Sequence, residues 1–204
     1  FFDEEYKIIA DTNTLDLDPR SFSQRIDIIE FDIPESNNEI GTQEDKINKK
    51  EKTALIEKII VNDRNLGAGL SRNKGIASAK GIYVGFIDAD DLWKNNHLQE
   101  LYKLRKVHPH CGLYAMGYTK KFDNAEPIHA HYFGLEKHSG VVDDFFLSSI
   151  VDCIAWTSAL MVPKIVFQKL GGFNGGLKTN EDTEMWIRIA LNYSVAFCWK
   201  MTAC

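Results

Sequence analysis

Short apolar runs along the chain alternate with longer segments in which apolar residues recur every three or four positions. The runs predict buried strands, and they occupy residues 6–10, 25–33, 56–61, 82–87, 112–119, 157–162 and 194–199. The periodic segments predict helices over residues 68–79, 95–107, 143–150, 163–170 and 181–192. Strands that alternate with helices in this way indicate an α/β fold, with a Rossmann-like, mostly parallel sheet flanked by helices.

One stretch departs from this pattern. Residues 35–52 are almost wholly polar, with lysine and glutamate crowded together, which fits an exposed loop, a solvated helix or a linker. The length of 204 residues suits one domain, so we expect residues 1–204 to form a single unit. The chain starts without methionine and stops inside an apolar stretch, which leads us to expect a fragment of a longer protein.

Charge and cysteine content narrow the class of protein. The net charge is −5, and acidic and basic residues are interspersed rather than gathered into a basic stripe, which argues against nucleic acid as a partner. The four cysteines form no Cys-x-x-Cys pair, so we expect reduced thiols and a cytoplasmic location. No apolar run approaches the roughly 18 residues that span a bilayer. We therefore expect no transmembrane segment in this chain, and at most peripheral association with a membrane.

The candidate chemistry centres on the end of the apolar run 82–87. Asp88, Asp90 and Asp91 follow it within four residues, and in an open α/β sheet ligands bind at this end of a strand. Three neighbouring carboxylates repel one another, and a hard divalent cation such as Mg²⁺ or Mn²⁺ would relieve the repulsion. The local alternative is that Asp90 or Asp91 caps the following helix. A phosphotransferase or phosphatase with Asp88 as covalent nucleophile is a second alternative, although the sequence shows no partner motif for it.

Two further blocks flank these carboxylates. Upstream the chain reads Asn65-Leu66-Gly67-Ala68-Gly69-Leu70-Ser71-Arg72-Asn73-Lys74-Gly75, and downstream it reads Gly171-Gly172-Phe173 and then Glu181-Asp182-Thr183-Glu184-Met185-Trp186. In this order and spacing, the three blocks resemble the family-2 glycosyltransferases of the GT-A fold. Each block alone is a modest signal, and the ordered set is a strong one. The resemblance covers roughly residues 56 to 192.

The resemblance implies roles for the donor-side residues. In this family the last aspartate of the motif binds a divalent cation, Mn²⁺ or Mg²⁺, held by the donor diphosphate; here that residue is Asp90, with Asp91 in support. Asp88 would lie near the nucleoside or its ribose. Asn65 and Arg72 would contact the nucleotide, and a guanidinium suits an anionic leaving group. The implied partner is a nucleotide-sugar donor, and we expect a UDP-sugar because it is the commonest donor in the family.

The same resemblance implies that Asp182 is the catalytic base and that Glu181 helps to hold the sugar or acceptor. The implied reaction is a metal-assisted displacement with inversion onto a glycan or lipid-linked acceptor. A local alternative is a capping box between Thr179 and Asp182 at a helix start. Trp156 falls where the family lines its acceptor site, either as a platform for sugar stacking or as a core residue. The Gln-x-x-Arg-Trp element of processive synthases is absent, so transfer of a single sugar is favoured.

The match fails on the N-terminal side. Family members open with an apolar strand and a turn that shape the nucleobase pocket, and this first strand is missing from the sequence. Residues 7–16 loosely resemble the family's second strand, on which Asp11 would touch the base or the ribose. Residues 17–55 match no family element. A non-catalytic module that keeps the scaffold but has lost donor binding is therefore the alternative to an active transferase.

Overall fold

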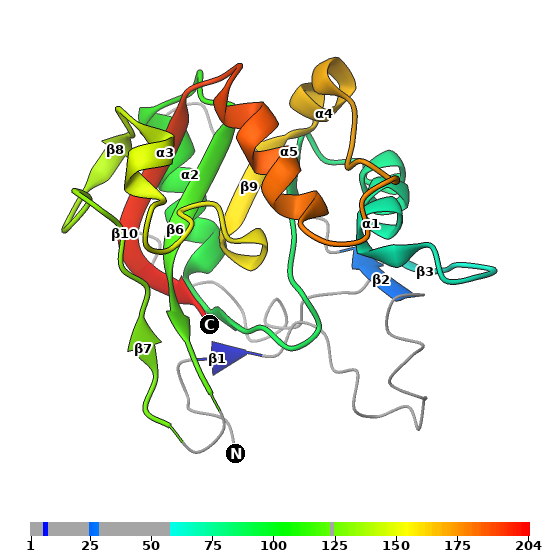
Figure 1. The fold of residues 1–204 in the computed structure, drawn as a ribbon, viewed down its shortest axis with the longest axis horizontal. Helices are drawn as coiled ribbons and strands as arrows, with labels where there is room; N and C mark the ends of the chain where they lie inside the picture. The colour runs from blue at the N-terminus through cyan, green and yellow to red at the C-terminus, as the bar shows by residue number, and fades with distance from the viewer. Residues whose placement is uncertain (1–5, 8–24, 29–57, 123–124) are drawn as a thin grey trace, which may run out of the picture.

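The structure is a computed structural model that describes residues 6–7, 25–28, 58–122 and 125–204 (Figure 1). Its strands are β1 Tyr6–Lys7, β2 Arg25–Ile28, β3 Lys58–Val61, β4 Tyr83–Gly85, β5 Trp93–Lys94, β6 Leu113–Lys120, β7 Ile128–His129, β8 Ser139–Val141, β9 Leu160–Pro163 and β10 Val195–Ala203. Its helices are α1 Gly67–Ser78, α2 His97–Val107, α3 Phe145–Ser148, α4 Lys164–Leu170 and α5 Glu181–Ala190, with a 3₁₀ turn η2 at Thr157–Ala159. Asp11 and the polar stretch 35–52 lie outside the described residues.

The main sheet follows the order β1-β5-β10-β6-β9-β4, with β7 paired to β6 and β8 paired to β10. β10 and β6 are parallel, and β9 lies antiparallel between β6 and β4, so β4, β6 and β10 run in one direction. β2 and β3 form a separate antiparallel pair. The α/β architecture is as predicted, but the sheet is mixed where the pattern indicated a mostly parallel one. Continuous apolar runs report burial of both strand faces and carry no information on strand direction.

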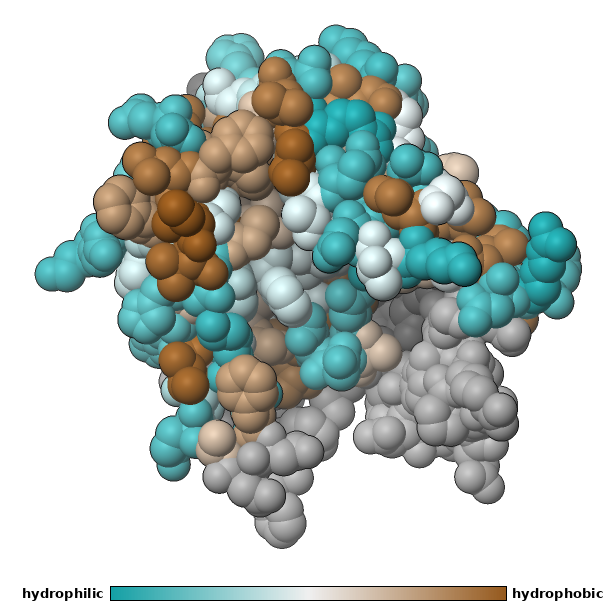
Figure 2. All heavy atoms as spheres, in the orientation of Figure 1, coloured by the Kyte–Doolittle hydropathy of each residue, from teal (hydrophilic) through white to brown (hydrophobic). Residues whose placement is uncertain are grey.

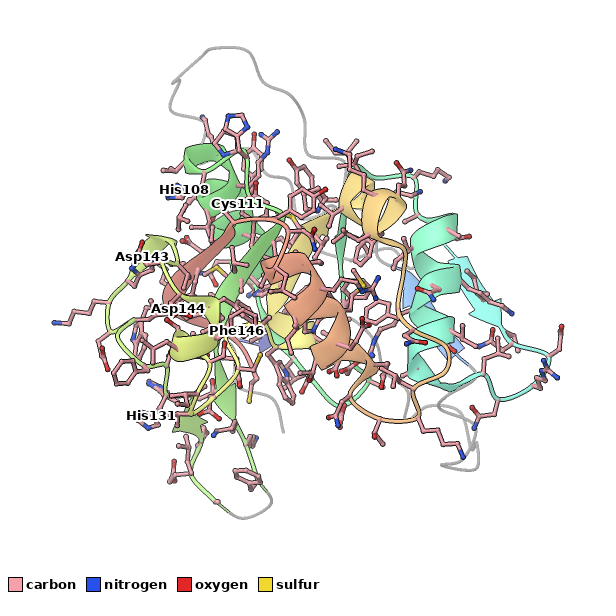
Figure 3. All side chains as sticks on the ribbon, turned by 45° about the horizontal axis from the view of Figure 1, so that its top comes forward. His108, Cys111, His131, Asp143, Asp144 and Phe146 are labelled. Carbon is pink, nitrogen blue, oxygen red and sulfur yellow. The ribbon has the colours of Figure 1, made fainter. Side chains whose placement is uncertain are left out.

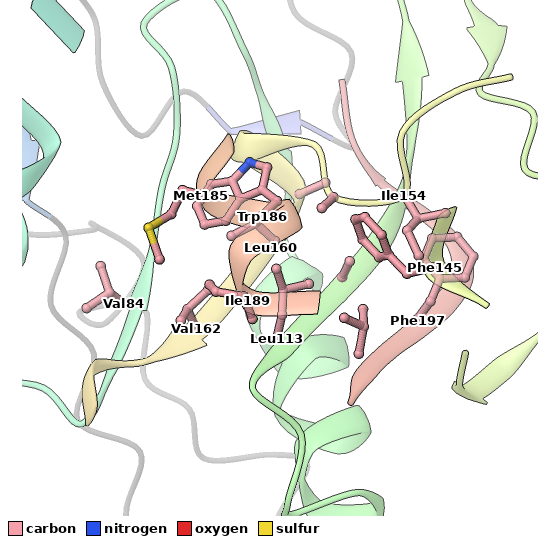
Figure 4. Close-up of a cluster of buried hydrophobic side chains, with 14 of the residues drawn as sticks. Val84, Leu113, Phe145, Ile154, Leu160, Val162, Met185, Trp186, Ile189 and Phe197 are labelled. Atoms are coloured by element: carbon pink, nitrogen blue, oxygen red, sulfur yellow. The ribbon is translucent and has the colours of Figure 1, made fainter. Parts of the chain in front are cut away.

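Two apolar layers cover the two faces of the sheet. Alternate residues of a strand point to opposite faces, so Leu113 of β6 joins the larger core cluster whereas Tyr114 joins the smaller one. α5 packs on the larger cluster (Figure 4), whose members include Leu113, Leu160, Val162, Met185, Trp186, Ile189 and Phe197. α2 covers the other face through Leu101 and Leu104. The central strands are thereby held on both sides, which fixes the loops at their ends.

The helix predictions agree with the structure to within a few residues. α1, α2, α4 and α5 all begin and end near the expected positions, and α3 is shorter than the predicted 143–150. The predicted strand 157–162 begins instead as the turn η2, and only Leu160–Pro163 is extended. β7 and β8 lie in a segment that shows no strand pattern, because they are too short to produce an alternation.

The surface and the thiols give few functional clues. Exposed apolar side chains gather around α3 (Figure 2), and they include Phe146, Leu147, Ile150 and Val151. In the described part of the chain, no helix is both long and apolar enough to cross a bilayer. All four cysteines, Cys111, Cys153, Cys198 and Cys204, are free thiols, as their spacing predicted.

Candidate active site

The loop that contains Asp88, Asp90 and Asp91, here called the aspartate loop, lies at the carboxyl end of β4. The Asp88 backbone N–H donates to Ser158 Oγ at 2.8 Å, and the Asp91 N–H donates to the Asp88 carbonyl at 3.1 Å, which closes a turn. α2 begins only after this loop, with Asn96 as its N-cap residue and no side-chain cap. The interpretation of Asp90 or Asp91 as a helix cap is therefore wrong. The loop folds back against Ser158, which also forms a side-chain hydrogen bond with Asp91.

Arg72 joins the upstream block to both acidic blocks. Its guanidinium donates from Nη2 to Asp88 Oδ1 at 2.8 Å and from Nη1 to Glu181 Oε1 at 3.0 Å. The guanidinium carbon also lies 5.6 Å from the centre of the Phe173 ring. The side chains of Arg72 and Glu181 are each 13% exposed, so this ion pair is largely sheltered from solvent. A planar guanidinium can bridge two carboxylates in this way, whereas an ammonium presents a single point charge.

Asp182 lies in the first turn of α5 and faces η2. Its Oδ2 accepts a hydrogen bond from Thr157 Oγ1 at 3.1 Å, and its Oδ1 accepts one from the Thr183 N–H at 2.7 Å. The N-cap residue of α5 is Asn180, in the left-handed conformation with φ of 58°, and it makes no side-chain cap bond. The alternative interpretation, a capping box between Thr179 and Asp182, is therefore wrong. The positive end of the helix dipole still favours negative charge at this first turn.

Trp156 connects the same region to the aspartate loop. Its indole Nε1–H donates to Asp91 Oδ2 at 3.3 Å, and its ring stacks on Tyr118 with centroids 5.2 Å apart. The residue is 41% exposed, so the interpretation of Trp156 as a core residue does not hold. Burial raises the pKa of Asp91 above its usual range, and the charges of Asp88 and Asp90 add to this, against hydrogen bonds from Ser158 and Trp156.

These contacts bring four of the predicted carboxylates into one network. Asp88 and Glu181 share Arg72, while Asp91 and Asp182 accept from the consecutive residues Trp156 and Thr157. Thr157 and Ser158, which complete the network, escaped the sequence prediction because the run 157–162 has the composition of a buried strand. Two adjacent hydroxyl residues at the start of an otherwise apolar run were the available signal.

Other predicted residues lie at the edge of this network or outside it. Asp90 is exposed beside Asp91. Asn65 is exposed in the loop before α1, where its Oδ1 accepts from the Gly67 N–H at 2.9 Å; Gly67 has φ of 77°, which favours glycine. No described contact joins Asn65 to the carboxylates. Asp11 falls outside the described residues, so its expected contact with the base or ribose stays a prediction.

Hydrogen bonds from α1 and α5 hold the block Gly171-Gly172-Phe173 in place. The Asn73 side chain donates to the Phe173 carbonyl and accepts from the Phe173 N–H, both at 2.8 Å. A Cβ on Gly172 would lie 2.1 Å from Asn73 Oδ1, so this close approach requires glycine. On the other side, Arg188 donates to the carbonyls of Leu170 and Gly172. The loop that leads to Glu181 and Asp182 is thus held by side chains from two helices.

The carboxylates at this site suit a cation only if a bound substrate supplies further oxygen ligands. Within residues 58–122 and 125–204, no group of three or more His, Cys, Asp and Glu side chains converges to hold a metal ion. Asp88 is engaged by Arg72, which leaves Asp90 and Asp91 as the available carboxylates. Mg²⁺ and similar ions are commonly held by one or two carboxylates together with phosphate oxygens of the substrate. The residues present fit that arrangement and do not fit a metal site built from protein groups alone.

Comparison with known proteins agrees with this geometry. The model of glycosyl transferase family 2 matches residues 47–164, more than half of the 204 residues. The chain belongs to this family. The family match covers the upstream block and the aspartate loop, and it ends before Glu181 and Asp182. Family membership argues against the phosphotransferase or phosphatase hypothesis for Asp88.

Relatives and solved structures extend the comparison. The family-2 chain is 24% identical over 137 residues to TuaG of Bacillus subtilis, which is provisionally assigned as a teichuronic acid biosynthesis glycosyltransferase, covering 64% of this chain and 48% of that protein. It is 28% identical over 136 residues to an uncharacterized glycosyltransferase of Rickettsia typhi, covering 65% of this chain and 42% of that one. The chain thus spans about half the length of these relatives.

The fold is similar to that of S. aureus TarS. The structure of TarS residues 1–349 aligns with a TM-score of 0.56 and 19% identity, over 70% of this chain and 41% of that one. The structure of the same protein with UDP gives a TM-score of 0.57 at 18% identity, over 70% and 41%. The structure with UDP-GlcNAc gives 0.54 at 18% identity, over 67% and 38%. This likeness confirms the GT-A-like fold predicted for the family-2 chain.

Proposed function

We propose that the protein transfers a single hexosyl unit from a UDP-sugar to a hydroxyl of a glycan or lipid-linked acceptor, with inversion at the anomeric carbon. One observation carries the proposal: Asp91 and Asp182 accept hydrogen bonds from the consecutive residues Trp156 and Thr157. A donor-side carboxylate and a candidate base therefore belong to one site. The solved TarS structures with UDP and UDP-GlcNAc, which share the fold, support a uridine nucleotide as donor.

Asp182 is the proposed general base. Its Oδ1 accepts two intramolecular hydrogen bonds, both from Thr183, whereas its Oδ2 accepts one, from Thr157, and has room for a second donor. An acceptor hydroxyl can therefore bond to Asp182 without displacing Thr157. As this hydroxyl attacks the anomeric carbon, its proton passes to the carboxylate and the bond to the nucleoside diphosphate breaks. Inversion follows because nucleophile and leaving group lie on opposite faces of the sugar.

Asp90 and Asp91 are the proposed ligands of a divalent cation, Mn²⁺ or Mg²⁺. When bound, such a cation neutralises charge on the departing diphosphate. Burial and the charges of Asp88 and Asp90 raise the pKa of Asp91, and a cation beside this carboxylate would offset both effects. Asp88 is the proposed contact of the nucleoside or ribose, with Asn65 and Asp11 on the same side of the donor.

Arg72 and Glu181 have a proposed role in connecting the aspartate loop with the start of α5. Arg72 already binds Asp88 and Glu181, so we assign it to the organisation of both carboxylates as well as to the nucleotide. Glu181 would then hold the sugar or acceptor at a position set by Arg72. Trp156, with its exposed ring, is the proposed platform for a sugar ring, because aromatic faces pack against the apolar faces of sugars.

Asp182→Asn tests the proposal. General-base assistance contributes about 10²–10⁴ in rate, which corresponds to roughly 3–5 kcal/mol of barrier. We expect this loss in nucleoside diphosphate release from a panel of sugar nucleotides with Mn²⁺, while stabilisation by UDP with Mn²⁺ in thermal unfolding stays unchanged. The matched control is Asp143→Asn, an exposed carboxylate beside α3 (Figure 3). Turnover equal to that of the control would remove Asp182 from the mechanism.

The same measurements separate an active transferase from a non-catalytic module. A module that has lost donor binding would show no stabilisation by UDP, with or without Mn²⁺, and no release of nucleoside diphosphate in the parent. An active transferase would be stabilised only when nucleotide and cation are both present. In that case Asp90→Ala should abolish the dependence on Mn²⁺.

A further inference from the structure

The segment Trp156-Thr157-Ser158, here the 156–158 segment, contains two hydroxyl residues that solvent scarcely reaches. Thr157 is 2% exposed and Ser158 is 0% exposed, and the neighbouring Ala155, Ala159 and Leu160 are buried apolar residues. A buried hydroxyl costs free energy unless it is hydrogen-bonded. The hydrogen-bond partners of these two hydroxyls therefore explain why Thr157 and Ser158 are buried.

Each residue of the segment contacts an acidic residue, and these acidic residues belong to two elements, the aspartate loop and α5. Trp156 donates to Asp91, Thr157 donates to Asp182, and Ser158 Oγ accepts from the backbone N–H of Asp88. Because an ionised carboxylate can only accept, the Thr157 hydroxyl must be the donor to Asp182. These partners lie 65, 25 and 70 residues away along the chain.

The segment is itself fixed to the centre of the sheet. The Ala159 N–H donates to the Trp156 carbonyl at 2.8 Å, which closes the 3₁₀ turn. Leu160 then enters β9 and pairs with Ala115 of β6. The Ser158 carbonyl also accepts from the indole N–H of Trp93. The core of the sheet, and not a surface loop, therefore sets the positions of the Trp156 indole N–H and of the Thr157 and Ser158 hydroxyls.

We infer that the 156–158 segment fixes the separation between the donor-side aspartates and the base, with Thr157 as the positioning residue for Asp182. This inference rests on the proposed function, in which Asp182 takes the proton of the acceptor hydroxyl. Thr157 acts through Asp182, whose Oδ2 accepts its hydrogen bond. A base displaced by about 1 Å loses roughly 10²-fold in rate, so a single buried donor at this place controls turnover.

Thr157→Val and Thr157→Ser form the test. Valine keeps the shape of threonine and removes the hydroxyl, whereas serine keeps the hydroxyl and removes the methyl group. We expect Thr157→Val to lower kcat by about 10-fold to 100-fold with KM for the donor changed less than about threefold, and Thr157→Ser to restore most of the lost kcat. Equal kcat in the parent and Thr157→Val would overturn the inference. So would equal defects in the valine and serine variants, which would indicate packing alone.

Two further arms separate this inference from the proposed function. If Thr157 acts through Asp182, the double variant Thr157→Val with Asp182→Asn should be no slower than Asp182→Asn alone; additive losses would contradict the inference. Crystal structures of Thr157→Val and Thr157→Ser report the position of Asp182 without any turnover. A parent without turnover on the sugar-nucleotide panel defeats the proposed function, whereas an Asp182 carboxylate that keeps its place in Thr157→Val defeats the positioning role.

Discussion

Replacement of Arg72 by methionine should weaken the fold as well as the site. Methionine preserves most of the apolar stem of arginine and removes the guanidinium, which lies over the Phe173 ring. Two carboxylates then lose their shared partner, Asp88 at 2.8 Å and Glu181 at 3.0 Å. Glu181 suffers more, because its side chain is 13% exposed whereas that of Asp88 is 38% exposed. A sheltered carboxylate without a cation has neither full hydration nor a compensating charge.

The expected magnitude follows from these exposures. A hydrogen bond to a charged group contributes about 1.5–3 kcal/mol. The contact with Glu181 should contribute within that range, and the contact with Asp88 about 0–1 kcal/mol, because solvent screens it. We therefore expect Arg72→Met to lower the free energy of unfolding by about 1.5–4 kcal/mol. For a chain of this size, that corresponds to a fall in Tm of about 3–16 °C.

Urea unfolding followed by tryptophan fluorescence measures this change. The matched control is Lys74→Met, an exposed cation on the same helix. Arg72→Lys should recover less than half of the loss, because a single ammonium nitrogen cannot occupy the positions of both Nη1 and Nη2, which contact different carboxylates. Adding Glu181→Gln to Arg72→Met should recover more, because it removes the uncompensated charge. The reasoning is refuted if Arg72→Met differs from Lys74→Met by less than about 0.5 kcal/mol, a typical effect of a surface substitution.

Three further outcomes follow from the same structure. Because burial raises the pKa of Asp91 above its usual value of 3.8, its contribution to stability is fully present below pH 3.8 and is lost as the pH rises through the raised value. Asp91→Asn should thus have a higher Tm than the parent at pH 7, with the gap closing toward pH 3.8; a constant gap would contradict this. Gly172→Ala should destabilise the protein by about 1–3 kcal/mol by forcing Asn73 aside, whereas Gly85→Ala, whose Cβ would meet nothing closer than 3.5 Å, should have a smaller effect in the same unfolding assay. Mn²⁺ with UDP should quench tryptophan fluorescence in the parent and much less in Trp156→Phe; equal quenching would place the cation elsewhere.

The sequence predicted the helices well, and it singled out acidic residues that the structure brings close together, in both cases from local signals. The periodicity of α5 follows from Met185, Trp186 and Ile189, which all pack on the sheet. The position of Asp88 at a strand end follows from the apolar run before it. Such signals depend only on neighbouring residues, so they can be detected in a single amino-acid sequence.

The remaining features depend on contacts between distant parts of the chain. Arg72 meets Asp88 and Glu181, which lie 16 and 109 residues away, and no local pattern specifies that arginine as a bridge. The hydroxyls of Thr157 and Ser158 likewise gain their roles only when β9 enters the sheet between β4 and β6. The direction of β9 is itself a property of pairing and is not encoded in its apolar composition.

The last residues of β10 have a practical consequence for protein engineering. The Leu92 N–H donates to the Cys204 carbonyl at 2.7 Å, and the Cys204 N–H donates to the Leu92 carbonyl at 2.9 Å. Ala203 pairs with Trp93 in the same short ladder. Shortening the protein to Thr202 would cut these bonds and release the backbone directly after Asp91. Truncated versions of the protein should therefore keep residues 203 and 204, because without them the backbone after Asp91 loses both bonds although every acidic side chain is still present.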